Sequence, residues 1–149
     1  MKKLLFSFVA LITLLVGCNQ SASQGQGDSP EDIAKIAYEW EKANFDRDYE
    51  KQQEFIYEEG SYEAYKGDKK IDSGLKYDDI SFEIYKDKEL EQYYVFADFD
   101  NPNGDNFVED NILFRKKSDE WKVDTIKSLD IVREEVSRKF ERAACINCE

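Results

Sequence analysis

Apolar residues recur at helical spacing between residues 30 and 58. Ser29 suits the cap of a helix and Pro30 its first position, and the acids at the next two positions favour the positive end of the helix dipole. Apolar side chains then recur at helical spacing at Ile33, Ile36, Ala37 and Trp40, and a second stripe continues through Phe45, Tyr49, Gln52 and Ile56. We therefore predict helices at 30–44 and 46–58, or one bent helix.

Alternation of apolar and polar residues replaces this spacing from residue 80 onward. Ile80, Phe82 and Ile84 would share one face of a strand, while residues 93–99 are apolar on both faces, as in a central strand. Two more strands are predicted at 107–114 and 121–126, because turn-forming clusters separate them from their neighbours. Four consecutive strands predict an antiparallel meander.

A last apolar stripe predicts a helix near residues 129–144, with Leu129, Val132, Val136 and Phe140 on one face. Helices followed by a run of strands are typical of an α+β fold. We expect an N-terminal helix or helix pair packed on a curved antiparallel sheet of about four strands, plus a C-terminal helix. Residues 30–149 would form this single domain.

The first 17 residues are composed unlike the rest. Lys2 and Lys3 precede an uncharged run at 4–16, which at 1.5 Å per residue would cover roughly 20 Å and is too short to cross a membrane. A basic start followed by an apolar run of this length is typical of an export signal. Residues 1–17 are therefore predicted to be a signal peptide.

Leu15-Val16-Gly17-Cys18 resembles the lipobox of bacterial lipoproteins. The resemblance implies that Cys18 receives a diacylglyceryl group and becomes the first residue after cleavage. It also implies a protein anchored by lipid at the extracytoplasmic face of the cell membrane. Residues 18–29, rich in Ser, Gln and Gly, would be a flexible tether between the anchor and the domain.

The amino-acid composition excludes several kinds of catalytic, metal and nucleic-acid-binding site. The chain contains no histidine, which removes histidine-based catalytic triads and most zinc sites. Removal of residues 1–17 takes away two of the 21 basic residues and none of the 33 acidic residues, leaving a net charge of −14. A surface with this charge repels phosphate groups, so we expect no nucleic-acid partner.

Two cysteines remain if Cys18 is acylated. Cys145 and Cys148 are spaced C-x-x-C near the end of the chain, where an oxidising compartment favours a disulfide. Free thiols or a redox-active or metal-binding pair remain alternatives. The redox alternative is weakened because reactive C-x-x-C pairs lie at the start of a helix, whereas this pair follows the predicted C-terminal helix.

The acidic cluster at 98–110 is a candidate calcium-binding segment, because it is rich in side chains with oxygen ligands. Aligned as a twelve-residue loop from Asp98 to Glu109, it has Pro102 at the fifth position and Asn103 where a calcium loop needs glycine. A solvated hairpin turn is the simpler interpretation, with a cation site as the alternative. We therefore assign no metal site.

Aromatic residues offer a further candidate site. Trp40, Tyr94, Phe96 and Trp121 would line a ligand pocket if they met between the helix and the sheet, although aromatic core packing explains them equally well. Catalysis by carboxylates would need groups such as Asp98 and Asp110 to face each other across a hairpin, close to Tyr38, Tyr93 and Tyr94. Nothing in their spacing separates these groups from ordinary surface and core residues, so we expect neither an enzyme nor a cofactor.

The order of elements and the strand Trp121-Lys122-Val123-Asp124 after a basic turn resemble the nuclear-transport-factor-2-like and cystatin-like domains of many small lipoproteins of Gram-positive bacteria. The resemblance implies a non-catalytic module that binds another protein of the cell envelope, for example part of a transfer or secretion apparatus. A pocket for a small ligand between helix and sheet is the alternative. The predicted helix with Cys145 and Cys148 departs from the family pattern.

Overall fold

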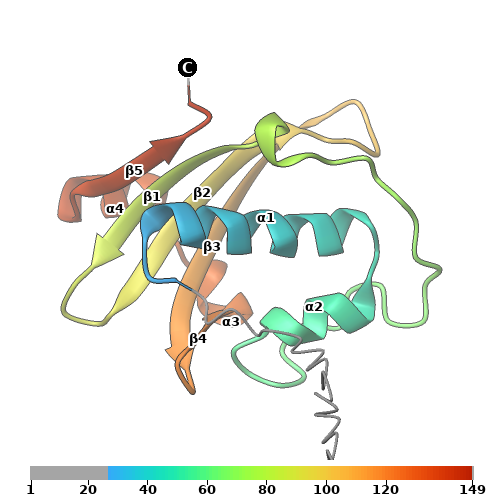
Figure 1. Ribbon diagram of the computed structural model, residues 1–149, viewed down its shortest axis with the longest axis horizontal. Coiled ribbons are helices and arrows are strands. Elements are labelled where there is room, and N and C mark those ends of the chain that lie inside the picture. Colours follow the sequence, from blue (N-terminus) through green and yellow to red (C-terminus); the bar gives the residue numbers. More distant parts are fainter. Residues whose placement is uncertain (1–26, 149) are drawn as a thin grey trace, which may run out of the picture.

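Two helices precede a five-stranded antiparallel sheet in the computed structural model, which describes residues 27–148 (Figure 1). The strand order is β4-β3-β2-β1-β5, so the first four strands form a meander and the last one returns to β1. In chain order the elements are α1 (Pro30–Phe45), α2 (Tyr49–Phe55), the 3₁₀ turn η1 (Tyr77–Asp79), β1 (Ser81–Asp87), β2 (Gln92–Asp100), β3 (Phe107–Lys117), β4 (Glu120–Val123), α3 (Thr125–Ser128), α4 (Arg133–Lys139) and β5 (Arg142–Ile146).

Side-chain caps fix the start of each N-terminal helix. The Ser29 hydroxyl accepts a hydrogen bond from the Asp32 backbone N–H at 3.2 Å, and Asp48 accepts one from the Lys51 backbone N–H. Between the helices the chain reverses at Arg47, which has a left-handed φ of 55°. The predicted helix pair is therefore confirmed, with α2 shorter than expected.

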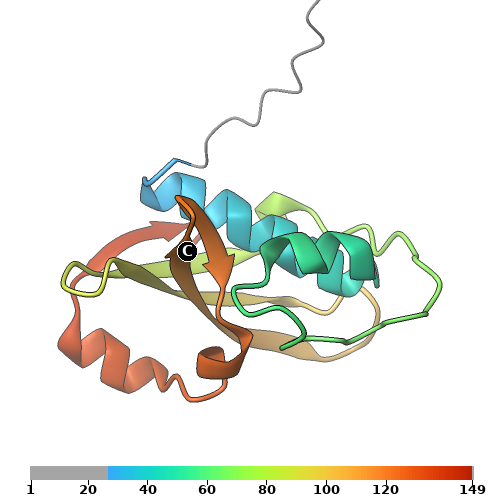
Figure 2. The same ribbon diagram turned by 90° about the horizontal axis from the view of Figure 1, so that it is seen from below.

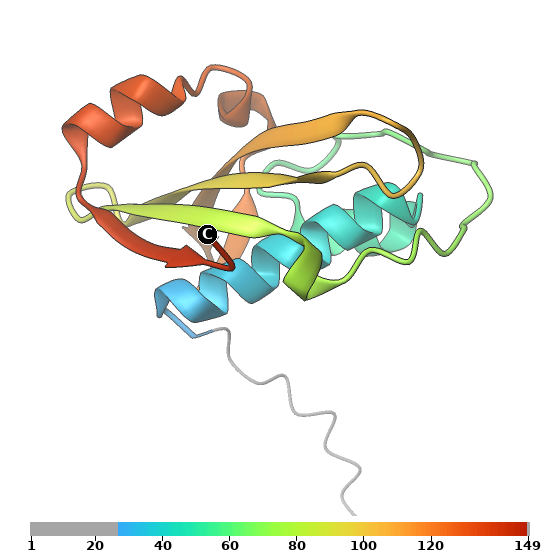
Figure 3. The same ribbon diagram turned by 90° about the horizontal axis from the view of Figure 1, so that it is seen from above.

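The sheet has a packed layer on each face. Figures 2 and 3 show α1 and α2 on one side of the sheet and α4 on the other. Because side chains alternate along a strand, each strand contributes to both layers. The α1 side holds the larger core, which includes Ile33, Ala37, Trp40, Phe82, Val95, Ile112 and Phe114, while Tyr85, Phe96 and Val136 form a smaller core under α4.

The α+β arrangement is thus confirmed, but the C-terminal prediction is wrong in its details. Residues 129–144 do not form one helix, because α4 ends at Lys139 and β5 follows as a fifth strand paired with β1. Pairing with β5 satisfies the backbone groups that would lie open at the edge of β1. In addition, Leu129 and Val132 of the predicted apolar face are exposed, and Val136 is the one buried residue of α4.

The strand predicted at 121–126 is also too long. β4 ends at Val123, and Asp124 instead caps the short helix α3 by accepting a hydrogen bond from the Lys127 backbone N–H. Asp124 also accepts a hydrogen bond from Arg115 of β3 at 2.8 Å. The side chain that ends the strand therefore starts the helix and ties it to the sheet.

The start of the domain is held firmly against the strands. The Asp28 carboxylate accepts hydrogen bonds from the Trp121 indole and from Lys116, both at 2.9 Å, and its carbonyl accepts one from the Tyr93 hydroxyl. The predicted tether at 18–29 therefore ends in two fixed residues, Asp28 and Ser29. Its earlier part, to residue 26, lies outside the described residues, as do the predicted signal peptide and Cys18.

Candidate functional site

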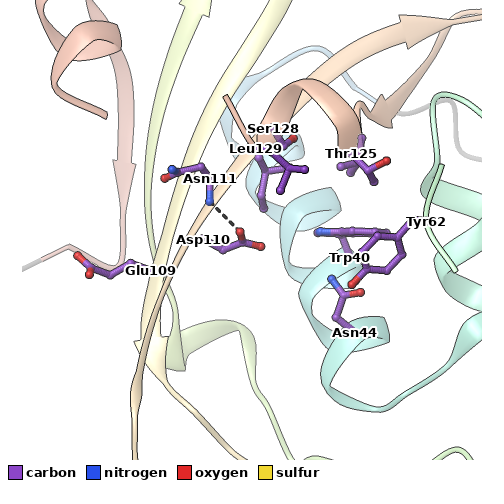
Figure 4. Close-up of a pocket in the computed structure, with 11 residues that line it drawn as sticks. Trp40, Asn44, Tyr62, Glu109, Asp110, Asn111, Thr125, Ser128 and Leu129 are labelled. Atoms are coloured by element: carbon purple, nitrogen blue, oxygen red, sulfur yellow. Dashed lines mark hydrogen bonds between the residues drawn. The ribbon is translucent and has the colours of Figure 1, made fainter. Parts of the chain in front are cut away.

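A pocket of about 300 Å³ opens between α1, the loop that follows α2, strand β3 and the β4–α3 connection. Figure 4 shows the Asp110 carboxylate pointing from β3 into this space toward Trp40, while Glu109 points away from it. We call this space the Asp110 pocket. Its lining residues are Trp40, Asn44, Tyr62, Glu109, Asp110, Asn111, Ile112, Val123, Thr125, Ser128 and Leu129.

A second hollow of about 190 Å³ adjoins the Asp110 pocket, and we call it the Glu41 recess. The two spaces share Asn44, Tyr62 and Asp110, so the Asp110 carboxylate lies at their junction. The recess adds Glu41 and Tyr65 to the polar and aromatic lining. Together the two spaces have the size and the mixed lining of a small-molecule site.

Glu41 is the most unusual side chain at this site, because it is a carboxyl group with only 1% of its surface exposed. Helix α1 places it there, eight residues after Ile33 and four after Ala37 on the stripe that faces the core. Its Oε1 atom has no hydrogen-bond partner among the described residues. A buried polar atom without a partner is costly, so this one needs an explanation.

Burial raises the pKa of Glu41 well above its ordinary value, and the negative charge of Asp110 and a hydrogen bond with Asp110 raise it further. The raised pKa favours the protonated form of the Glu41 carboxyl, which donates a hydrogen bond to Asp110. The pair then carries one negative charge instead of two.

Tyr62 covers the same space from the loop after α2. Its ring packs against the indole of Trp40, with the ring centres 5.1 Å apart. Burial raises the pKa of Tyr62 to about 12, with smaller contributions from Tyr65, Glu41 and Asp110. The hydroxyl of Tyr62 is therefore protonated at every physiological pH.

The charge of the site is uniformly negative or neutral. No lysine or arginine is among the described residues that line the Asp110 pocket or the Glu41 recess. The neighbouring Arg47 lies over the ring of Tyr65, with its guanidinium carbon 5.6 Å from the ring centre. The site consequently combines acidic side chains and aromatic walls with no basic side chain in its described lining.

The four residues predicted to form a pocket lie at separate places. Trp40 lines the Asp110 pocket, but Phe96 and Trp121 are buried core residues, and Tyr94 stacks on Phe140 beneath α4 with ring centres 5.3 Å apart. The alternation of side chains on β2 explains the difference, since Tyr94 and Phe96 face α4 and not α1.

The groups considered for catalysis do not meet either. The register of β2 and β3 pairs Asp98 with Glu109, so Asp98 does not face Asp110 across the hairpin. Asp98 forms an ion pair of 2.5 Å with Arg133 at the start of α4. The hydroxyls of Tyr38 and Tyr93 donate to the backbone carbonyls of Leu75 and Asp28, which leaves Asp110 as the one member of this set in the pocket lining.

Sequence reasoning did not identify Glu41, Asn44 or Tyr62. Glu41 had a usable signal, because an acid on the apolar stripe of α1 must either be buried or interrupt the core. Tyr62 had none, since it lies in the irregular segment between α2 and η1 and reaches Trp40 only through the tertiary fold. Asn44 lies on α1 one turn after Trp40, and its Oδ1 accepts a hydrogen bond from Gln52 at 3.0 Å.

The two C-terminal cysteines are joined by a disulfide, with their Cα atoms 5.7 Å apart. Cys145 lies in β5 opposite Glu83 of β1. The disulfide closes a turn at the end of the edge strand, where Asn147 donates hydrogen bonds to the carbonyls of Tyr77 and Ile80. Its position is that of a structural link at the C-terminal end of the sheet, away from the Asp110 pocket.

Between residues 27 and 148, no group of three or more Cys, Asp or Glu side chains is arranged to hold a metal ion. The acidic segment at 98–110 forms the ends of β2 and β3 and the turn between them. None of the helices within the same residues has the length and apolar character needed to cross a membrane.

Another hollow, of about 440 Å³, lies on the opposite face of the sheet beside α4. Exposed apolar side chains line this hollow, most prominently Leu90 with 68% of its surface exposed, and also Val132. Both lysines and acids line it, including Lys127, Asp130, Glu135 and Lys139. We call the exposed residues Ile126, Leu129 and Val132 the α3–α4 surface.

Comparison of the chain with protein-family models, with curated proteins and with solved structures found no match.

Proposed function

We propose that this chain is a lipid-anchored protein of the extracytoplasmic membrane face whose domain binds a small ligand in the Asp110 pocket. The observation that carries the proposal is the buried Glu41–Asp110 pair, with a Glu41 oxygen that has no partner in the described structure. A ligand that donates to this oxygen would satisfy it. The resemblance of residues 15–18 to a lipobox supports the proposed membrane location, and Cys18 would carry the lipid anchor.

The proposed role is binding and not catalysis. The two aliphatic hydroxyl groups that line the pocket are engaged in structural hydrogen bonds, Thr125 with Ser61 at 2.7 Å and Ser128 with the Asp124 carbonyl at 2.8 Å. Neither is paired with a carboxylate base, which is the arrangement that activates a hydroxyl nucleophile. The likeness to nuclear-transport-factor-2-like and cystatin-like domains belongs to the same proposal, and the packing of α1 on the sheet beside the pocket supports it.

Ligand binding is tested by saturation-transfer NMR with a set of cationic, neutral and anionic compounds of metabolite size. Thr125→Trp should fill the pocket and abolish the signals, whereas Ile126→Trp is a matched control because the adjacent side chain on α3 lies outside the lining. Binding that disappears only in Thr125→Trp supports the proposal. Signals that persist in Thr125→Trp, or a compound set without any binder, contradict it.

The membrane anchor needs a separate test. Cells producing the full-length chain would be grown with labelled palmitate, and the protein should incorporate the label and partition into the membrane fraction. Cys18→Ala should lose the label, while Cys145→Ala with Cys148→Ala should keep it. Label that survives the substitution of Cys18 would contradict the lipobox assignment.

A second candidate function is binding of another envelope protein through the α3–α4 surface. It is favoured by the exposure of Ile126, Leu129 and Val132 on neighbouring turns of chain. Apolar side chains gathered on a surface are typical of contact sites between proteins. A photo-crosslinking residue at Leu129 would test it, with a second one at exposed Glu39 on α1 as the control; the candidate fails if both positions give the same products.

A further inference from the structure

The Glu41–Asp110 pair has two properties that a ligand must match. Asp110 lines both hollows and Glu41 lines the recess, and neither hollow contains a basic side chain among the described residues. The Oε1 atom of Glu41 is an acceptor without a partner there. A ligand that fits must therefore bring both a positive charge and hydrogen-bond donors.

The walls around the pair are aromatic. Trp40 and Tyr62 line the pocket together, with their ring centres 5.1 Å apart, and Tyr65 lines the recess. The faces of aromatic rings attract organic cations, and a combination of rings with carboxylates is a common way to hold an ammonium group. Arg47 over Tyr65 shows that one of these rings already holds a cation within the protein.

We propose that the Asp110 pocket and the adjoining Glu41 recess together bind a small organic cation, with its ammonium group at the Glu41–Asp110 pair and its hydrocarbon part against Trp40 and Tyr62. This inference rests on the proposed ligand-binding function and names the class of ligand. The hollow of about 300 Å³ has room for a cation of metabolite size.

A metal ion fits the site less well. Calcium takes six to eight oxygen ligands and magnesium six, whereas two carboxyl groups meet here and no third acidic side chain completes a cluster within residues 27–148. Aromatic rings supply no oxygen atoms to a hard cation except through a hydroxyl group. An anionic ligand would face the charge of Asp110 without a basic partner in the lining.

The test uses three probes of the same shape and different charge: butylammonium, 1-butanol and butyrate. Each would be titrated into ¹⁵N-labelled wild-type protein at neutral pH, following the amide signals of Asn44, Tyr62 and Asp110 and the indole signal of Trp40. Butylammonium should shift these signals, with an affinity about tenfold or more above that of 1-butanol, because a charged hydrogen bond is added. Butyrate should leave them unchanged.

Two variants identify the source of the preference. Asp110→Asn keeps the shape and removes the charge, and it should lower the affinity for butylammonium about tenfold while leaving 1-butanol unaffected. Asp105→Asn makes the same change at an exposed residue of the same hairpin and should have no effect. Tyr62→Leu should weaken butylammonium binding by about twofold to fivefold, which corresponds to the loss of one ring–cation contact.

The possible failures are distinguishable. If 1-butanol or butyrate binds as well as butylammonium, and Thr125→Trp blocks it, then the pocket function stands and the cation inference is wrong. If calcium chloride shifts the same signals and Asp110→Asn abolishes that shift, the pair is a metal site and the inference is overturned. If none of the probes shifts the pocket signals, the inference is also wrong, and the compound set described above decides the pocket function separately.

Discussion

Replacement of Glu41 by glutamine should stabilise the protein, and more so as the pH rises. The side chain is almost completely buried, and its pKa is raised first by burial and then by the charge and hydrogen bond of Asp110. Glu41→Gln preserves the shape and supplies an amide N–H that can donate to Asp110 in place of the carboxyl proton. It removes only the ability to ionise.

The magnitude follows from the linkage between protonation and folding. Glu41 in the unfolded chain loses its proton near its ordinary pKa of 4.5, whereas the folded protein retains it to a higher pH. Above pH 4.5 the unfolded state therefore gains stability that the folded state does not share. The free energy of unfolding of the wild type falls by about 1.4 kcal/mol per pH unit from this group until the pH passes the folded pKa.

Urea denaturation followed by tryptophan fluorescence measures the effect. Between about pH 5.5 and pH 7, above the isoelectric point of 4.5, the stability advantage of Glu41→Gln should grow by up to about 2 kcal/mol. Other carboxyl groups titrate in both proteins and cancel in the difference. Glu39→Gln, at an exposed position of α1, should run parallel to wild type; parallel curves for Glu41→Gln as well would refute the reasoning.

Three further outcomes are expected. Replacement of Cys145 and Cys148 by serine should lower the free energy of unfolding by no more than about 2 kcal/mol, because the closed loop is short; reduction of the wild type should have the same effect. Phe96→Ala should cost about 3–5 kcal/mol in urea denaturation, since the ring is fully buried under α4. Although burial opposes it, hydrogen bonds from Lys42 and Ser73 hold the pKa of Asp46 below its ordinary value. Wild type should therefore have a stabilisation near neutral pH that it loses as the pH falls through the folded pKa, and Asp46→Asn should remove it. An unchanged dependence of stability on acid pH in Asp46→Asn would contradict this.

The fold was largely predictable because most elements carry a local signal. The cap at Ser29, the apolar stripe of α1 and the alternation along β1 all act over a few residues. The C-terminal region differs because its conformation depends on a distant partner. Residues 142–146 become a strand because β1 has an open edge beside them. Nothing in the sequence of this segment indicates that a pairing partner is available.

The site was much less predictable than the fold. The side chains that form it come from α1, the irregular segment at 56–76 and β3, and only the tertiary structure brings them together. Tyr94 and Phe96 were plausible pocket residues by type, but strand alternation directs them to the other face. Trp40 was the one pocket prediction that lines the Asp110 pocket, because it lies on the core stripe next to Glu41.

The central claim is that the domain holds a ligand at Glu41 and Asp110, and the two indole N–H signals of the protein test it most directly. Trp40 lines the pocket, whereas Trp121 is a core residue whose indole donates to Asp28, so it serves as an internal reference. Titration with the tightest compound from the saturation-transfer set should shift the Trp40 indole signal and leave that of Trp121 in place. A shift of neither signal, or movement only of residues around α4, would show that the ligand binds elsewhere.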